Sequence, residues 1–107
     1  MNMKMYRQGD ILIIEREEIP DNLEFIQNDD HDRIVLAWGE STNHSHAIKD
    51  KNATYFFDKT NNKFYLFITK PVELQHEEHS TITFPVGKYE IIRQRFYTPE
   101  AIKYVAD

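Results

Sequence analysis

Apolar residues along this chain gather in short runs, and polar, turn-forming segments separate one run from the next. Runs of this length that are rich in β-branched and aromatic residues predict strands rather than helices. The predicted strands cover residues 11–16, 33–38, 42–48, 54–57, 63–68, 72–76, 81–84 and 89–96. Many short strands at close spacing are typical of a small antiparallel β-barrel or sandwich.

The last segment of the chain predicts a helix. Thr98 suits an N-cap, Pro99 suits the first helical position, and Glu100 adds an acid to the first turn. A length of 107 residues suits one domain, and no internal repeat or linker divides the sequence. The sequence therefore predicts a single all-β domain over residues 1–107 that ends in a short C-terminal helix.

Composition limits what this domain is expected to do. The sequence has no cysteine, which excludes disulfides and thiolate zinc sites, so any metal must be held by histidine and carboxylate. The net charge of -5 argues against generic DNA binding. No apolar run is long enough to span a bilayer and the start has no signal-peptide pattern, so we expect a cytoplasmic protein with no membrane partner.

Four of the five histidines stand in two close pairs, His44 with His46 and His76 with His79. Neutral imidazole is the commonest protein ligand for transition metals. On a strand, residues two apart point to the same face, so His44 and His46 are expected to project together. His76 and His79 are three apart, and they converge only where the chain turns or bulges between them. The fifth, His31, stands among acids and turn formers and is predicted to be a solvated loop residue.

If the two histidine segments lie side by side, up to four imidazoles surround one point. We predict a divalent transition metal there, either Zn, Fe, Mn or Ni, because these ions accept histidine and carboxylate ligands. The predicted ligands are His44, His46, His76 and His79. Acids in the same segments, Glu40, Glu77 and Glu78, are expected to serve as extra ligands or as a general base.

A second cluster of polar residues lies on the predicted strand 89–96. Alternation places Tyr89, Ile91, Arg93, Arg95 and Tyr97 on one face. Guanidinium groups bind phosphate or carboxylate in bidentate fashion, so Arg93 and Arg95 are predicted to orient an anionic substrate. The alternative is equally compatible with the pattern: this face is the solvent side of an edge strand, shielded by its arginines.

Other residues receive structural interpretations. Trp38 and the aromatic set Phe56, Phe57, Phe64 and Phe67 are predicted to be core. Gly9 and Asp10 are predicted to form a turn, with no assigned role for Asp10 in the site. A small β domain with an exposed edge strand often pairs with itself, so a homodimer is compatible with the sequence.

Three functions from different classes fit these features. We favour a small metal-dependent enzyme, such as a hydrolase, that acts on a small anionic substrate such as a phosphate-containing one. The first alternative is a metal-independent phosphodiesterase or ribonuclease that uses one histidine as base and another as acid. The second alternative is a non-catalytic viral or regulatory interaction module whose histidines are incidental.

Part of the chain resembles the cupins. Gly39, His44 and His46 approximate the first half of the cupin pattern, and residues 85–87 resemble the Pro-x-Gly of the second half. The resemblance implies a small β-barrel that binds a metal through two histidines, a glutamate and a later histidine. The chain departs from the pattern in two places: the expected glutamate is missing after His46, and Glu90 stands where the last histidine belongs.

Most of the chain also resembles small uncharacterised bacterial and phage proteins. These share a Gln-Gly-Asp start, Gly-Glu-x-Thr-x-His-x-His, His-Glu-x-His, Pro-x-Gly-x-Tyr and an Arg-Gln-Arg-x-Tyr-x-Pro-Glu tail. The corresponding segments here are residues 8–10, 39–46, 76–79, 85–89 and 93–100. This resemblance implies a shared layout without implying a particular activity.

Overall fold

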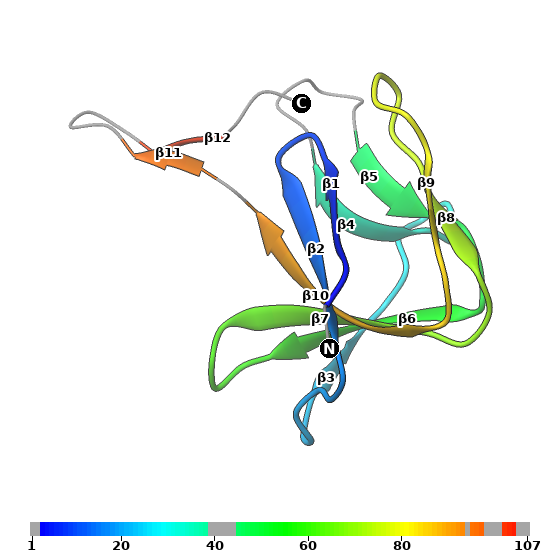
Figure 1. Cartoon of the computed structure of the whole chain (residues 1–107), viewed down its shortest axis with the longest axis vertical. Coiled ribbons are helices and arrows are strands. Elements are labelled where there is room, and N and C mark those ends of the chain that lie inside the picture. Colours follow the sequence, from blue (N-terminus) through cyan, green and yellow to red (C-terminus); the bar gives the residue numbers. More distant parts are fainter. Residues whose placement is uncertain (1–2, 39–44, 94, 98–101, 105–107) are drawn as a thin grey trace.

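The structure is a computed structural model that describes residues 3–38, 45–93, 95–97 and 102–104, the last two segments by their backbone. These residues form twelve strands and no helix (Figure 1), which confirms the all-β prediction. All of the strand pairs are antiparallel, as predicted. Since the described part contains no helix, it has none long and apolar enough to cross a membrane.

The predicted C-terminal helix is wrong over the part that the structure describes. Strand β12 (Ile102–Tyr104) pairs with strand β11 (Arg95–Tyr97) in a small two-stranded sheet. Isoleucine and tyrosine both favour extended backbone, and pairing with β11 satisfies the backbone of this segment. The predicted helix start at residues 98–100 lies outside the described residues.

Six strands form the main sheet, in the order β1-β2-β10-β7-β6-β3. Their bounds are β1 (Met5–Gln8), β2 (Ile11–Arg16), β10 (Gly87–Arg93), β7 (Lys63–Ile68), β6 (Ala53–Asp58) and β3 (Glu24–Ile26). The end strands β1 and β3 pair with different neighbours rather than with each other, so the described strands do not close into a barrel. The barrel alternative of the sequence prediction is therefore wrong, while strands β2 and β7 match their predicted ranges.

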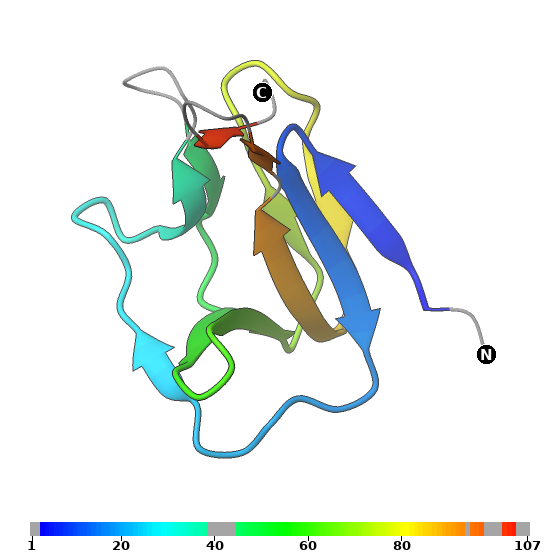
Figure 2. The same ribbon diagram turned by 90° about the vertical axis from the view of Figure 1, so that its left-hand side faces the viewer.

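Two hairpins complete the fold. Strand β4 (Ile34–Trp38) pairs with β5 (Ser45–Ile48), and β8 (Val72–Leu74) pairs with β9 (Ile82–Phe84). Ala47 and Gln75 join the hairpins by one β-bridge, with N–H···O distances of 2.9 and 2.8 Å. Figures 1 and 2 place the tip of the β1–β2 hairpin, the start of β5 and the β8–β9 loop at the same end of the molecule.

One hydrophobic cluster joins the sheet to both hairpins. Ile13 and Leu66 of the sheet, Ile48 of the first hairpin, and Leu74 and Phe84 of the second all belong to it and are fully buried. Burying each such side chain contributes about 1.5–3 kcal/mol of hydrophobic stabilisation. The cluster therefore holds the two hairpins against the sheet, which fixes the segments that carry the histidines.

The prediction that Trp38 belongs to the core is wrong, since 56% of its surface is exposed. The β4–β5 register shifts between Val35 and Ala37. Such a bulge reverses the alternation of faces along a strand, so Ala37 is buried where regular alternation from Leu36 would bury Trp38. Of the four predicted core phenylalanines, all of which are half-buried, Phe64 packs against the hydrophobic cluster.

The predicted long strand 89–96 is two strands, because β10 ends at Arg93 and β11 begins at Arg95. Strand β10 lies between β2 and β7, so the edge-strand alternative is wrong. Tyr89 and Ile91 face the hydrophobic cluster, and the Tyr89 hydroxyl donates a hydrogen bond of 2.8 Å to the Pro85 carbonyl. The strand face predicted to carry tyrosines and arginines is therefore buried in the core at Tyr89 and Ile91.

Candidate metal centre

Three of the four paired histidines come together at the end of the molecule where the hairpins meet. His46 lies on β5 with no exposed surface, and its ring centroid is 4.4 Å from that of His76. The His76 and His79 centroids are 4.6 Å apart, and those of His46 and His79 are 6.2 Å apart. The fourth histidine, His44, lies outside the described residues. The structure thus brings together histidines from two hairpins, as the sequence analysis expected.

A bend in the chain unites His76 and His79. The His76 Nδ1 accepts hydrogen bonds from the backbone N–H groups of Glu78, at 3.0 Å, and of His79, at 3.3 Å. A side-chain acceptor bonded to N–H groups two and three residues later stabilises a tight turn, in the way that an asparagine side chain does. This bend satisfies the condition under which the second histidine pair can join the first.

The β1–β2 hairpin adds Asp10 and Gln8 to the histidine cluster. Strands β1 and β2 are joined by the two-residue loop of Gly9 and Asp10, in which Gly9 has a φ of 57°. A positive φ at this position favours glycine. The loop turns Asp10 inward, so that 1% of its surface is exposed, and Asp10 Oδ1 lies 3.2 Å from Nε2 of His46.

Gln8 fixes the orientation of the His46 ring. The Gln8 amide nitrogen donates to the carbonyl groups of Leu74 and Ser80, both at 3.0 Å, so its amide oxygen faces Nδ1 of His46 at 2.8 Å. An amide oxygen can only accept, which requires Nδ1 of His46 to carry a proton and donate it. In the neutral ring, Nε2 then has a lone pair and no proton.

The contact between His46 Nε2 and Asp10 Oδ1 therefore joins two electron-rich atoms in a buried place. A proton or a metal ion between these two atoms would make their contact at 3.2 Å favourable. The third imidazole stands close by: Nε2 of His79 is buried and makes no hydrogen bond to any described residue. Within the described ranges, no group of three or more histidine, aspartate or glutamate side chains is placed so that it could hold a metal ion.

The predicted acids and arginines are placed differently. Glu77 is exposed at the edge of the cluster, where Oε1 accepts a hydrogen bond of 2.8 Å from the backbone N–H of Ser45. Glu40 and the Arg95 side chain lie outside what the structure describes. Arg93 lines a hollow on the main sheet together with Tyr55, Lys63 and Glu90. That hollow shares no lining residue with the histidine cluster, whereas Glu77 lines the hollow that includes His76.

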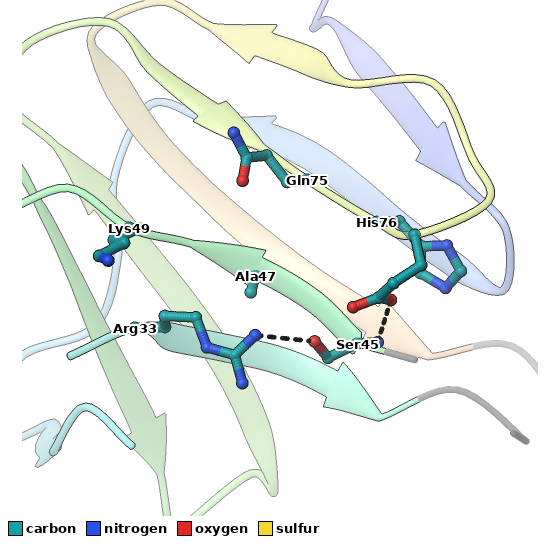
Figure 3. A pocket seen from close by; sticks show the side chains of 7 residues that line it. Arg33, Ser45, Ala47, Lys49, Gln75 and His76 are labelled. Atoms are coloured by element: carbon teal, nitrogen blue, oxygen red, sulfur yellow. Dashed lines mark hydrogen bonds between the residues drawn. The ribbon is translucent and has the colours of Figure 1, made fainter. Parts of the chain in front are cut away.

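A second hollow of about 220 Å³ borders the cluster. Its lining includes Arg33, Ser45, Lys49, Gln75, His76 and Glu77. His76 and Lys49 lie at its opposite ends in Figure 3. The Arg33 guanidinium donates to Ser45 Oγ at 3.3 Å and to Asp29, and its hydrogen bonds lower the pKa of Asp29 to about 2. We call this hollow the Arg33 groove.

Sequence reasoning missed Gln8, Asp10 and Arg33. The turn at Gly9 and Asp10 was predicted, but the packing of that turn against β5 depends on the order of strands in space. The shared Gln-Gly-Asp segment was the available signal, since it includes both residues that contact His46. His31 is exposed in its loop, as predicted.

Comparison with known proteins gives a family and no activity. No curated protein and no solved structure matches the chain. One family model matches residues 7–94, a span that includes Gln8, Asp10 and the three clustered histidines. The chain therefore belongs to the family described as a domain of unknown function, DUF8820.

Proposed function

We propose that this protein binds one divalent transition metal ion at the histidine cluster and is a small metal-dependent enzyme for an anionic substrate. The proposed ligands among the described residues are Asp10, His46 and His79, and the sequence adds His44. The contact of 3.2 Å between Nε2 of His46 and Oδ1 of Asp10 carries the proposal. Because Gln8 holds the proton on the other ring nitrogen, this contact offers a lone pair and a carboxylate to a cation.

The energetics of burial support a cation at this place. A carboxylate as buried as that of Asp10 is stabilised by positive charge close to it. A metal ion at the contact with His46 would supply such charge, and it would also use Nε2 of His79, which is buried and bonds to no described residue.

The rings of His46 and His79 lie farther apart than two ligands of a tetrahedral ion. With metal–nitrogen bonds of about 2.0–2.1 Å, two imidazoles on such an ion hold their centroids roughly 5 Å apart. The His46–His79 distance is 6.2 Å, so the proposal requires the two rings to move closer by about 1 Å when the ion binds. A set of histidines and one carboxylate suits Zn, Fe, Mn or Ni.

The partial cupin pattern supports the same assignment for His46, although Asp10 then takes the place of the family's glutamate. The single hydrophobic cluster supports the interpretation of residues 1–107 as one β domain.

The Arg33 groove supports the enzymatic half of the proposal. Arg33, Lys49 and His76 line it, with Lys49 at the end opposite His76, so an anion in the groove would lie between Lys49 and the cluster. A bound ion with an open position polarises a substrate oxygen or activates water, and Glu77 is the adjacent carboxylate for proton transfer. The predicted Arg93 lines a separate hollow.

Burial counts against the metal-independent alternative in one respect. A general base must reach the proton that it abstracts, either directly or through one water. His46 has no exposed surface, and both of its ring nitrogens face buried side chains. A metal ion needs only to enter the cluster, whereas a phosphodiester would have to reach His46 itself.

Metal content is the direct test. We expect protein expressed without a histidine tag to hold close to one equivalent of a transition metal by elemental analysis. We also expect removal of the metal to lower the melting temperature and its return to restore it. Metal-free protein whose melting temperature stays the same in Zn²⁺, Fe²⁺, Mn²⁺ and Ni²⁺ would contradict the proposal.

Two histidine variants sharpen this test. His79→Asn removes a proposed ligand from a half-buried bend, and His31→Asn makes the same change at an exposed loop residue. We expect His79→Asn and His44→Asn to lose most of the bound metal, and His31→Asn to keep it. Equal metal content in all three variants would show that the paired histidines do not hold the ion.

A further inference from the structure

We propose that Glu77 is a positioning residue of the candidate site, and that its carboxyl group holds the two pairs of histidines at a fixed spacing. The inference deepens the proposed function and rests on it for the identity of the metal ligands. It assigns to Glu77 a task that depends on the reach of the side chain and on an oxygen that accepts a hydrogen bond, whereas proton transfer depends on its ionisation.

The hydrogen bond between Ser45 and Glu77 joins the inside of one histidine pair to the inside of the other. Ser45 stands inside the first pair, residues 44–46, and Glu77 inside the second, residues 76–79. The backbone N–H of Ser45 donates to Oε1 of Glu77 at 2.8 Å (Figure 3). This bond therefore sets how far the segments that carry the two pairs lie from each other.

The bond stands where a backbone hydrogen bond would otherwise form. Ala47 and Gln75 make an antiparallel β-bridge, with N–H···O distances of 2.9 and 2.8 Å. Two residues further along, an antiparallel ladder would pair the backbones of Ser45 and Glu77. The bridge is isolated, however, and the Ser45 N–H meets the side chain of Glu77 instead. The carboxyl oxygen thus takes the place of a backbone carbonyl oxygen.

The bend at His76 explains why a side chain makes this bond. Nδ1 of His76 accepts from the backbone N–H groups of Glu78 and His79, which turns the chain soon after strand β8 ends. The turn brings His79 toward His46 and ends the pairing with β5. A glutamate side chain is long enough to reach back to β5, so the two hairpins stay aligned although the chain bends between them.

The side chain of Ser45 is held by a second contact. The guanidinium of Arg33 donates to Oγ of Ser45 at 3.3 Å and to Asp29 at 2.7 Å. Ser45 has 2% of its surface exposed. Because its backbone is bonded to Glu77 and its side chain to Arg33, the start of β5 is fixed from two sides, and His46 follows directly after it.

This spacing bears on metal binding because two of the proposed ligands come from the two joined segments. The ring centroids of His46 and His79 lie 6.2 Å apart and must approach each other when an ion binds. Without the bond to Glu77, the start of β5 can move away from the β8–β9 loop. The ion would then have to order these segments as it binds, which lowers its affinity.

Three substitutions at Glu77 separate the reach of the side chain from its charge. Glu77→Gln keeps an acceptor oxygen at the same distance from the backbone but has no charge. Glu77→Asp keeps the charge but is shorter by one methylene group, and Glu77→Leu keeps neither property. We expect Glu77→Gln to bind Co²⁺ with an affinity within about threefold of the wild type. We expect Glu77→Asp and Glu77→Leu to lose about 10–100-fold.

The order of the variants decides between positioning and a role of the charge. If Glu77→Asp keeps more affinity than Glu77→Gln, the charge matters more than the reach, and the inference is overturned. Wild-type affinity in Glu77→Leu would overturn it as well. Glu73→Leu is the matched control, because it makes the same change at another exposed glutamate of the β8–β9 hairpin, and it should leave the affinity unchanged.

Amide hydrogen exchange of metal-free protein tests the bond without the ion. We expect the Ser45 amide to exchange about tenfold faster in Glu77→Asp and Glu77→Leu than in the wild type and Glu77→Gln, the effect of one lost hydrogen bond. The amide of Ile13 in the main sheet is the reference and should exchange equally in all four proteins. Equal Ser45 rates in all four would overturn the inference. If the wild type binds no Co²⁺, the proposed function fails, and the Ser45 rates alone decide whether Glu77 positions β5.

Discussion

Nε2 of His46 lies 3.2 Å from Oδ1 of Asp10, and the two residues come from different hairpins. Both side chains are buried, so the contact is shielded from water and its electrostatic consequences are large. Gln8 completes the arrangement from the opposite side of the ring. The turn of the β1–β2 hairpin thus presents the Asp10 carboxylate to His46 on the β4–β5 hairpin.

Removing the Asp10 charge should abolish tight metal binding. Asp10→Asn keeps the shape of the side chain but offers the ion a neutral oxygen, so we expect the metal affinity to fall by about 100-fold or more. Competition with a chromogenic chelator measures this change. Asp58→Asn is the matched control, because Asp58 is also a buried carboxylate but bonds to Asn61 in the β6–β7 loop. Equal affinities in the two variants would exclude Asp10 as a ligand.

Gln8 should matter for stability as well as for the ion. Gln8→Leu removes the acceptor for His46 and leaves the buried Leu74 carbonyl and the part-buried Ser80 carbonyl without the Gln8 donor. We expect the free energy of unfolding to fall by about 2–4 kcal/mol, measured by urea denaturation of metal-free protein. Gln75→Leu, at an exposed side chain, should change it by about 0.5 kcal/mol or less. A similar loss in both variants would argue against the hydrogen-bonding role of Gln8.

Alkaline pH should destabilise the fold through Tyr89. Burial raises the pKa of Tyr89 from 10.0 to about 12, so the folded state keeps its proton longer than the unfolded chain does. The resulting stability is complete below about pH 10 and is lost as the pH rises to about 12. We expect urea midpoints to fall across this range in the wild type and to fall less steeply in Tyr89→Phe. At pH 7, Tyr89→Phe should cost about 1 kcal/mol, because the Pro85 carbonyl loses its donor.

Acid should loosen the pair of Asp29 and Arg33. Hydrogen bonds from Arg33 lower the pKa of Asp29 to about 2, so the folded state binds this proton more weakly than the unfolded chain does. The contribution to stability is therefore present above the ordinary pKa of 3.8 and is lost as the pH falls to about 2.

The matching measurement is the pKa of Asp29, followed by the carboxyl ¹³C shift. We expect Arg33→Gln to return this pKa toward 3.8, because the charged hydrogen bonds from Arg33 are lost. Arg16→Gln, which removes the partner of Glu90 on the main sheet, should leave it unchanged. An Asp29 pKa that Arg33→Gln leaves at about 2 would show that other groups hold the carboxylate charged.

The parts of the fold that follow from local patterning were predictable. Strands β2 and β7 match because their apolar runs end at polar turns, which the sequence displays directly. The division between β10 and β11 was not predictable, since apolar and polar residues continue through it and different partner strands define it. The same holds for Trp38, whose exposure depends on a register shift in the β4–β5 pair.

In the candidate site, too, local sequence patterns and the packing of distant segments determine different features. The spacing of the histidines allowed their convergence only if the chain turns between His76 and His79, and the roles of Asp10 and Gln8 depend on how separate hairpins pack. The bend at His76 depends on a side chain that bonds to its own backbone, which residue spacing does not reveal.

The β-bridge of Ala47 and Gln75 joins the β4–β5 and β8–β9 hairpins next to His46, whose ring is buried. Within the described segments, these two residues alone link the hairpins by backbone hydrogen bonds, whereas each interior strand of the main sheet is paired on both sides. Separating the hairpins therefore costs less free energy than opening the sheet. The amide protons of Ala47 and Gln75 should therefore exchange with deuterium sooner than those of Ile13 and Leu66. The same separation of the hairpins would limit the rate at which the cluster takes up or releases an ion.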